Sequence, residues 1–171
     1  MNRLHSLASS LHFCWSNWRM SRRLPPARPV RQQGLCIRPA SRREVAQAFE
    51  IYATLLAGTR PSTAVRAALR LLRNPCLLLA LQETDEKQQL VGINFYYFNR
   101  RDITERTIHE GFIGVLPLHA GKGVATRMRE VARTQFRRAA LTGITTRIKQ
   151  SNAASLSSAL RTGFEIQERH P

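Results

Sequence analysis

Leu-Pro-Leu-His-Ala-Gly-Lys-Gly-Val-Ala-Thr, residues 116–126, lies between an apolar run and a long amphipathic segment. Its glycines, Gly121 and Gly123, let the backbone turn tightly and approach a ligand closely. The amphipathic segment predicts a helix, and the amides at a helix N-terminus are unpaired and lie at the positive end of the helix dipole. A glycine turn in this place therefore predicts a site for a phosphate group.

Two common phosphate-binding loops do not fit this turn. A P-loop has four residues between its first Gly and its Gly-Lys pair, then Ser or Thr, whereas six residues separate Gly114 from Gly121 and Gly123 follows Lys122. The dinucleotide-binding fingerprint needs a third Gly where this sequence has Thr126. The turn therefore belongs to another class of phosphate site.

Apolar spacing around the turn predicts the neighbouring elements. Residues 107–115 have the length and composition of a strand, and residues 124–142 carry apolar side chains at helical spacing. The arginines of that helix, Arg129 among them, are expected to face water. A strand over 144–149 and a helix over 152–163 follow, so that two parallel strands flank the long helix.

Upstream of residue 107 the pattern predicts more helices and strands. Ser41 and Glu44 have the spacing of a capping box, and Asn74 and Pro75 would end the second helix. Strands at 77–81 and 90–98 read as an antiparallel hairpin. The expected elements are a strand at 35–38, helices at about 41–57 and 62–73, and the strands at 77–81 and 90–98.

These features resemble the GCN5-related N-acetyltransferase (GNAT) superfamily. Its acetyl-CoA loop has Gln or Arg, two residues, Gly, one residue and then Gly or Ala, and residues 120–125 read Ala-Gly-Lys-Gly-Val-Ala. The opening strand at 37–40, the order of elements, and Asn152 followed by Gly163-Phe164 are also similar to the family. The resemblance covers about residues 35–171.

The resemblance implies an α/β fold whose mixed, largely antiparallel sheet contains a β-α-β-α core that binds acetyl-CoA. It implies an N-acetyltransferase that moves an acetyl group to an amine, carried by a small molecule or a peptide, without a metal. Glu110 is the candidate catalytic base, acting directly or through water. The expected acetyl-CoA contacts are Val115, Leu116, Ala120, Gly121, Lys122, Gly123, Val124, Ala125, Thr126 and Asn152.

Each of these residues also has a purely structural interpretation. The glycines could form only a tight turn, Val115 and Leu116 could be core, and Asn152 could only cap its helix. Glu110 could be an exposed residue at the end of a strand. His109 and His119 are expected to be structural or exposed.

Three departures from the family pattern leave alternatives open. Ala120 replaces the Gln or Arg that opens the loop, and Ala159 replaces a Tyr that protonates the leaving thiolate in many members. The chain also stops seven residues after Phe164, where the family adds further strands. The alternatives are a domain truncated at its C-terminus and a degenerate protein that binds acyl-CoA without turnover.

The charge is concentrated near the N-terminus. The chain has 27 Lys and Arg against 11 Asp and Glu, a net charge of +16, and residues 1–43 contain nine Arg and no acid. We expect residues 1–34 to be a basic, Pro-containing arm, disordered or a targeting segment, ahead of a domain over 35–171. A start at Met20, an Arg excess from a GC-rich coding sequence, and a basic module that binds nucleic acid or another anionic partner are the alternatives.

Cysteine usage bears on the compartment. Cys14, Cys36 and Cys76 form no metal-ligand or disulfide pattern, which favours a reducing compartment. The expectation is the cytoplasm, or an organelle matrix if residues 1–33 are a transit peptide. No apolar run is long enough to span a membrane, and a homodimer is left open.

Overall fold

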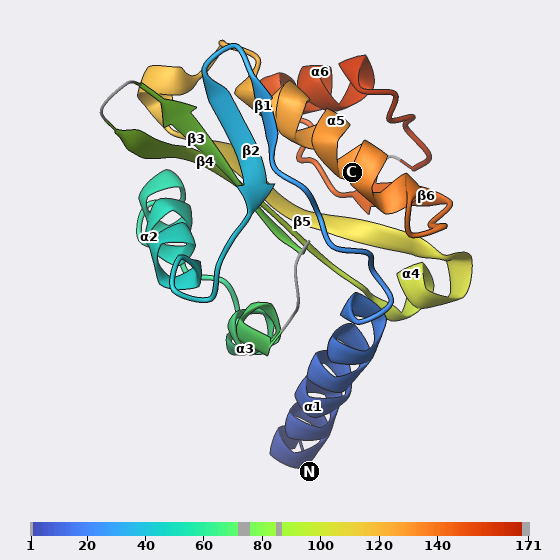
Figure 1. The fold of residues 1–171 in the computed structure, drawn as a ribbon. Coiled ribbons are helices and arrows are strands. Elements are labelled where there is room, and N and C mark those ends of the chain that lie inside the picture. The colour runs from blue at the N-terminus through green and yellow to red at the C-terminus, as the bar shows by residue number, and fades with distance from the viewer. Residues whose placement is uncertain (1, 72–75, 85–86, 169–171) are drawn as a thin grey trace.

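The strands form one sheet, and helices cover both of its faces, in this computed structural model (Figure 1). The structure describes residues 2–71, 76–84 and 87–168. The elements are α1 (Asn2–Ser21), β1 (Val30–Gln32), β2 (Leu35–Pro39), α2 (Val45–Leu55), α3 (Thr63–Leu71), β3 (Leu77–Glu83), β4 (Gln88–Tyr97), α4 (Arg100–Glu105), β5 (Thr107–Val115), a short 3₁₀ helix (Pro117–His119), α5 (Val124–Arg137), β6 (Gly143–Thr146) and α6 (Ala153–Arg161).

The sheet has six strands in the order of the sequence, β1-β2-β3-β4-β5-β6. All neighbours are antiparallel except β5 and β6, which are parallel. The predicted α/β fold with a mixed, largely antiparallel sheet is therefore confirmed. The parallel pair follows from the long helical connection between those two strands, since only a crossover of that length can return the chain in the same direction.

Two apolar layers cover the two faces of the sheet. On one face α5 contributes Val124, Met128, Ala132 and Phe136, which are at most 5% exposed. Their spacing places them on one side of the helix, as the apolar pattern predicted. On the other face α2 and α3 contribute a second cluster, and Figure 1 shows these helices across the sheet from α5 and α6. Burial of each large side chain contributes about 1.5–3 kcal/mol to stability.

The parallel strands fork. Pairing of β5 with β6 runs from Thr107–Gly143 to Glu110–Thr146, and β5 then continues through Val115 without a β6 partner. Gly111 is an extra residue in β5, because Tyr96 pairs with Glu110 whereas Phe95 pairs with Phe112. Such a bulge bends its strand. The fork begins at this bend and leaves one edge of β5 open.

Gly111 has a steric reason for being glycine. A Cβ atom added there would lie 2.1 Å from Cε1 of Tyr97. No neighbouring ring can be approached that closely, so the bend in β5 requires a residue without a side chain.

The N-terminal segment differs from the predicted disordered arm. Residues 2–21 form α1, and β1 pairs with β2. Asn17 is wholly buried: its Nδ2 donates to the Phe98 carbonyl at 2.9 Å, and its Oδ1 accepts from the Phe98 N–H at 2.7 Å. These long-range bonds fix the position of α1 by satisfying the backbone groups of Phe98, which follows β4. Because they are polar, no apolar pattern in the sequence indicates them. A targeting role stays a prediction.

Several predicted boundaries are modified. Ser41 and Glu44 form only half of a capping box, in which the Ser41 N–H donates to Glu44 Oε2 at 2.8 Å. The other carboxylate oxygen accepts from Arg38, and this bond lowers the pKa of Glu44 to about 2. Helix α4, which the sequence interpretation missed, begins with a capping box of Asn99 and Asp102. The expected stop at Asn74 and Pro75 lies outside the described residues.

None of the helices that the structure describes is long and apolar enough to cross a membrane.

Candidate functional site

The glycine turn stands open at the start of α5. Gly121 and Gly123 have φ angles of +73° and +77°, in the left-handed region that favours glycine. Both residues are exposed, and a Cβ atom added at either one would meet no atom within 4 Å. No side chain caps the helix at Gly123. The first-turn amides of α5 are therefore left for water or a ligand, as the phosphate-site prediction requires.

The charge around the turn favours an anion. The first turn of α5 contains no acidic residue, and Lys122 is exposed between the two glycines. Arg127 lies one turn into the helix, where Nη2 donates to the side chain of Gln33. Because the helix dipole adds positive potential at this end, the turn is suited to a phosphate group.

The predicted acetyl-CoA contacts fall into two groups. Ala120, Gly121, Lys122 and Gly123 are exposed on the turn, whereas Val124 is buried in the core at 5% exposure. Ala125 and Thr126 are partly buried, and Thr126 Oγ1 lies 3.2 Å from Ser158 Oγ on α6. The exposed group can contact a ligand directly, and the second group fixes α5 to its neighbours.

Three further predicted contacts have protein partners. The Leu116 N–H donates to the Val91 carbonyl at 2.8 Å, and the Leu116 carbonyl accepts from the His119 N–H at 2.9 Å. Asn152 Oδ1 accepts from the Ser155 N–H at 3.1 Å and so caps α6. Val115 ends β5 opposite Gly92. Ligand contacts by Leu116 and Asn152 stay predictions, since each residue already has a structural role.

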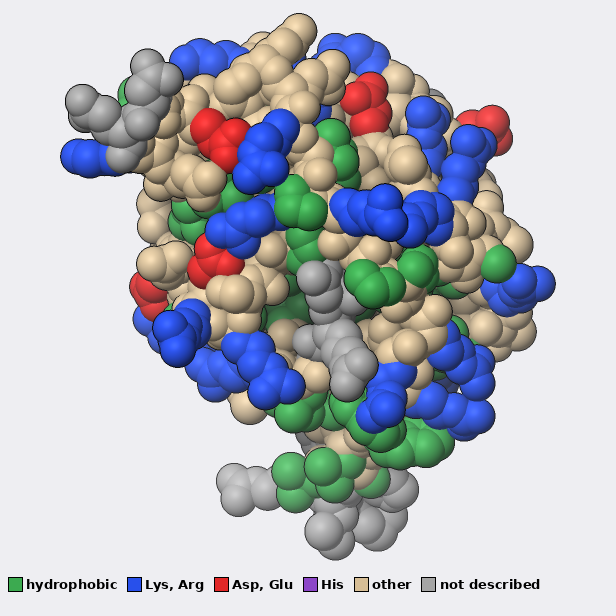
Figure 2. Space-filling view, viewed as in Figure 1, with side chains coloured by type: hydrophobic (Ala, Val, Ile, Leu, Met, Phe, Trp, Pro, Cys, Tyr) green, Lys and Arg blue, Asp and Glu red, His purple; other side chains and the backbone are tan. Residues whose placement is uncertain are grey.

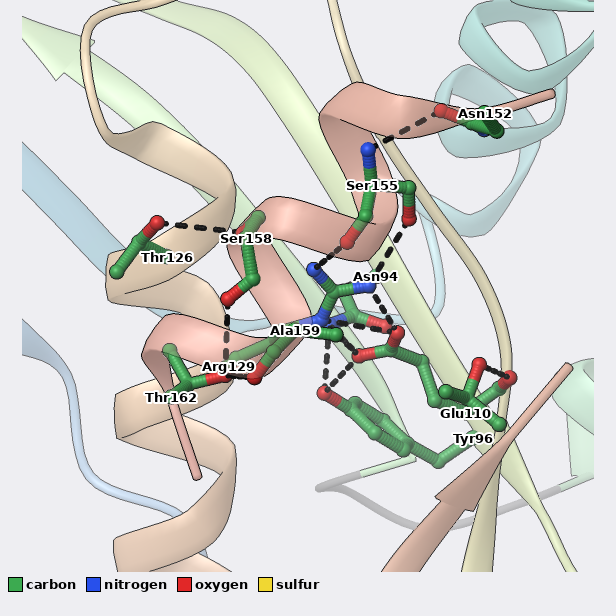
Figure 3. Close-up of polar contacts among 11 residues, drawn as sticks. Asn94, Tyr96, Glu110, Thr126, Arg129, Asn152, Ser155, Ser158, Ala159 and Thr162 are labelled. Carbon is green, nitrogen blue, oxygen red and sulfur yellow. Dashed lines mark hydrogen bonds and ion pairs between the residues drawn. The ribbon is translucent and has the colours of Figure 1, made fainter. Parts of the chain in front are cut away.

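Glu110 lies at the fork in a buried ion pair (Figure 3). Its Oε1 is 2.7 Å from Nη2 of Arg129, and both side chains are 1% exposed. The Nε of Arg129 also donates to both Glu110 oxygens, at 3.1 and 3.2 Å. The prediction that Arg129 faces water is wrong, because its guanidinium neutralises a carboxylate inside the protein. Burial of the pair also excludes the exposed strand-end interpretation of Glu110.

Two neutral side chains complete the surroundings of this carboxylate. Asn94 Nδ2 and Tyr96 Oη donate to Glu110 Oε2 at 3.1 and 3.4 Å. Burial raises the pKa of Tyr96 well above its ordinary value, and the nearby Glu110 charge adds to the effect. The Glu110 carboxylate is thus surrounded by donors, and its role as catalytic base stays a prediction.

Arg129 also joins the fork to α6. Its Nη1 donates to the Ser155 carbonyl at 3.1 Å, and its Nη2 lies 3.2 Å from Ser155 Oγ. The ring of Phe164 lies against the guanidinium, with Cζ 5.7 Å from the ring centroid. One side chain thereby connects β5, α5 and α6, and Figure 3 shows it between those elements.

His109 belongs to a hydrogen-bonded chain on the adjacent rung of β5. Its Nδ1 is 2.9 Å from Thr145 Oγ1 on β6, and that hydroxyl donates to Asp102 Oδ1 at 2.8 Å. Because Thr145 gives its proton to Asp102, it accepts from His109, which places the proton on Nδ1 and leaves Nε2 as an acceptor. Burial lowers the pKa of His109 and favours this neutral form.

The sequence held weak signals for these missed residues. Asp102 follows Asn99 at capping-box spacing, whereas Glu110 is itself the predicted candidate base. Arg129 carried no signal, since an arginine next to the core-facing Met128 has the ordinary pattern of an amphipathic helix. Among the described residues, no group of three or more His, Cys, Asp or Glu could hold a metal ion.

Comparison with known proteins agrees with this geometry. A family model described as "Acetyltransferase (GNAT) family" matches residues 44–164. No curated protein sequence matches the chain.

Solved structures share the fold at low sequence identity. YncA from Salmonella typhimurium, solved with its cofactor acetyl-CoA, is 21% identical, with a TM-score of 0.65 over 80% of this chain and 82% of that one. AAC(6')-Iy in complex with a bisubstrate analogue is 15% identical, with a TM-score of 0.64 over 81% and 96%. A ribosomal-protein-alanine N-acetyltransferase from Brucella melitensis biovar Abortus 2308 is 15% identical, with a TM-score of 0.56 over 80% and 96%.

The forked parallel strand pair and the glycine turn at the next helix belong to the fold that this chain shares with YncA, an acetyltransferase fold. The family match is then decisive, because it spans most of the chain, and the chain belongs to the acetyltransferase (GNAT) family. The predicted family and the predicted enzyme class are confirmed.

Proposed function

We propose that this protein transfers the acetyl group of acetyl-CoA to a primary amine. The observation that carries the proposal is the pairing of an open, left-handed glycine turn at an uncapped helix start with the free edge of β5 beyond the fork. The turn supplies amides for the pyrophosphate, and the free strand edge supplies backbone groups for the pantetheine arm. The neighbours include acetyltransferases named for aminoglycosides and for a ribosomal protein, so they leave the acceptor class open.

The chemistry is direct transfer. The amine nitrogen attacks the thioester carbonyl, the carbon–sulfur bond breaks, and the products are an N-acetyl amine and the thiol of coenzyme A. A backbone N–H near Val115 would polarise the carbonyl. The side chain of Ala159 offers no acid and is 2% exposed, so the departing thiolate takes its proton from water.

Two groups at the fork can accept the proton that the amine loses. Glu110, the predicted base, could do so only in competition with Arg129, Asn94 and Tyr96. His109 has Nε2 as an acceptor, and Nε2 has no hydrogen-bond partner in the part of the chain that the structure describes. We therefore propose Glu110 and His109 as the two candidates, to be separated by Glu110→Gln and His109→Gln.

The first experiment is melting of the full chain with and without acetyl-CoA. Ligand at about 100 times its dissociation constant adds about 2.7 kcal/mol, a rise of roughly 5–11 °C for a chain of this size. Gly123→Glu should abolish the rise by placing a carboxylate at the anion site. Gly58→Glu is the matched control, because Gly58 has a φ of +82° and equally open surroundings. An absent shift in the unchanged protein would contradict the proposal.

The second experiment measures release of the coenzyme A thiol with aminoglycosides, polyamines and peptides that begin with alanine. Replacement of the residue that acts as the base should lower turnover about 10²- to 10⁴-fold without weakening acetyl-CoA binding. Binding without release for every amine would favour the degenerate, non-catalytic alternative.

A further inference from the structure

Four large apolar side chains lie exposed in a row along α1. Leu7, Leu11, Trp15 and Trp18 are 61%, 71%, 54% and 41% exposed. At about 100° per residue they fall within about 80° of one another around the helix, and we call this row the outer stripe. Hydrophobic side chains gather at the lower end of Figure 2, where Figure 1 places α1 projecting from the body. An exposed apolar row of this kind indicates an interaction surface.

The outer stripe is held outward by the contacts of another face of α1. The rings of Phe13 and Tyr97 pack edge to face with 5.5 Å between their centroids, and Cys14, at the border of the outer stripe, has its Sγ 3.6 Å from the Ala64 carbonyl on α3. Asn17 binds both backbone groups of Phe98. Turning the helix to bury the outer stripe would break these bonds.

The charge beside the outer stripe is uniformly positive. Arg19 Cζ lies 5.5 Å from the Trp15 ring centroid, and Arg22 Cζ lies 4.9 Å from that of Trp18. Helix α1 itself contains no Asp or Glu. The surface therefore combines aromatic and aliphatic groups with the cations of Arg19 and Arg22.

We propose that α1 docks the outer stripe on an anionic lipid bilayer. Tryptophan is enriched at the membrane–water interface, where leucine reaches the acyl chains and arginine meets lipid phosphates. A second copy of this chain fits less well, because parallel packing of two stripes would bring Arg19 and Arg22 of both copies together, and antiparallel packing would offer them no acid on α1. The helix lies on the bilayer without crossing it, and the domain remains in water beside it.

The test is flotation of the full-length protein with vesicles of phosphatidylcholine alone or with about 30% phosphatidylglycerol. The protein should float with the anionic vesicles, and salt should weaken the binding. Trp15 and Trp18 are the two tryptophans of the chain, so their emission should shift to shorter wavelength on binding.

Variants separate the apolar from the electrostatic contribution. Leu11→Gln with Trp15→Gln should lower partitioning at least tenfold, and Arg19→Gln and Arg22→Gln should each lower it about fivefold. Leu118→Gln is the apolar control, because Leu118 is 82% exposed on the short helix before the glycine turn. The melting temperature should stay unchanged in all of them, since every altered side chain is exposed.

Two results would overturn the proposal. One is the absence of both flotation and an emission shift with the anionic vesicles. The other is a lipid-free dimer, seen by analytical ultracentrifugation, that Leu11→Gln with Trp15→Gln dissociates, because the outer stripe would then be a contact between copies. Neither result depends on acetyl-CoA, so the proposed enzymatic function would stand or fall separately.

Discussion

The two ends of β5 differ in what their polar groups contact. Beyond Val115 the chain enters an exposed glycine turn, and the helix that follows has no side-chain cap. Around Glu110 the polar side chains are buried and bonded to one another, through Arg129 on one face and through Thr145 and Asp102 on the next rung. At the first end the amides of α5 remain unbonded by side chains, whereas at the second end the side-chain donors bond groups on the neighbouring elements.

The difference shows how one strand serves two purposes. A buried ion pair adds little net stability, because desolvation offsets most of the attraction, but removal of one partner is costly. The Glu110–Arg129 pair therefore fixes where β5 leaves β6 more than it strengthens the fold. The glycine turn therefore follows a strand whose position is fixed, and its backbone need not change conformation to bind a ligand.

We expect the largest effect on stability at the end of β5 around Glu110, which we call the closed end because its polar side chains are buried. Arg129→Met leaves the Glu110 charge buried without its cation, which should destabilise the protein by about 3–5 kcal/mol. For a chain of this size the melting temperature should fall by roughly 6–20 °C. Arg137→Met, at an exposed position near the end of α5, should change stability by less than about 0.5 kcal/mol. Equal effects of the two variants would remove the contrast between the two ends.

The bend between the ends should be the next most sensitive place. Gly111→Ala puts a Cβ atom 2.1 Å from the Tyr97 ring, and relief of the overlap should cost about 1–3 kcal/mol in urea unfolding. Gly143→Ala, on β6, meets its nearest atom at 3.9 Å and should be nearly neutral. If Gly111→Ala unfolds at the same urea concentration as the unchanged protein, the bulge tolerates a side chain and the fork is not set there.

At the other end of β5, the open end formed by the glycine turn after Val115, substitutions should change the affinity for acetyl-CoA and leave stability nearly unchanged. Ala120→Arg places a guanidinium at the start of the glycine turn, where the family pattern has Gln or Arg, and should tighten acetyl-CoA binding about tenfold, roughly 1.4 kcal/mol. Titration calorimetry at two salt concentrations should show that the gain shrinks as salt rises. Ala46→Arg, which adds the same charge at an exposed position of α2, controls for net charge. A gain from Ala46→Arg of similar size would assign the effect to overall charge.

The smallest effect concerns pH. Because burial lowers the pKa of His109 below its ordinary value, the unfolded chain takes up this proton first as pH falls. The contribution of His109 to stability is therefore full above about pH 6.5 and is lost as pH falls through the folded-state pKa. Comparison of melting curves of the protein and His109→Gln should show a shallower acid slope in the variant.

The carboxylate of Glu44 gives an internal reference for that slope. The pKa of Glu44 is held at about 2 by Arg38, so its contribution is lost only as pH falls from about 4.5 towards 2. The loss at His109 therefore begins at a higher pH, about 6.5, than the loss at Glu44. A slope that persists above about pH 5 in His109→Gln would show that another group is responsible.

The open end of the site could be predicted from sequence, since it depends on local chemistry. The predicted tight turn at Gly121 and Gly123 and the predicted left-handed cap at Gly163 are confirmed, since all three glycines have positive φ angles. The parallel pairing of β5 and β6 could also be predicted, because a long helix connects the two strands. In both cases the determining residues are neighbours in the chain.

The closed end could not be predicted, because its determinants lie far apart. Arg129 and Glu110 are separated by 19 positions, and only the folded sheet brings them together. The same holds for α1, whose order depends on Asn17 bonding to Phe98, 81 positions away. The spacing of apolar residues indicates which face of an element is buried. It does not indicate a buried polar side chain whose partner lies far away in the sequence.

The bond between Asn17 and Phe98 has a consequence for biosynthesis. A ribosome that adds about 5–20 residues per second needs roughly 4–16 seconds to make the 81 positions between them. Throughout that interval α1 lacks the partner that later fixes its orientation. Helix α1 is thus secured long after its own synthesis, because β4 must be complete before Phe98 can bond Asn17.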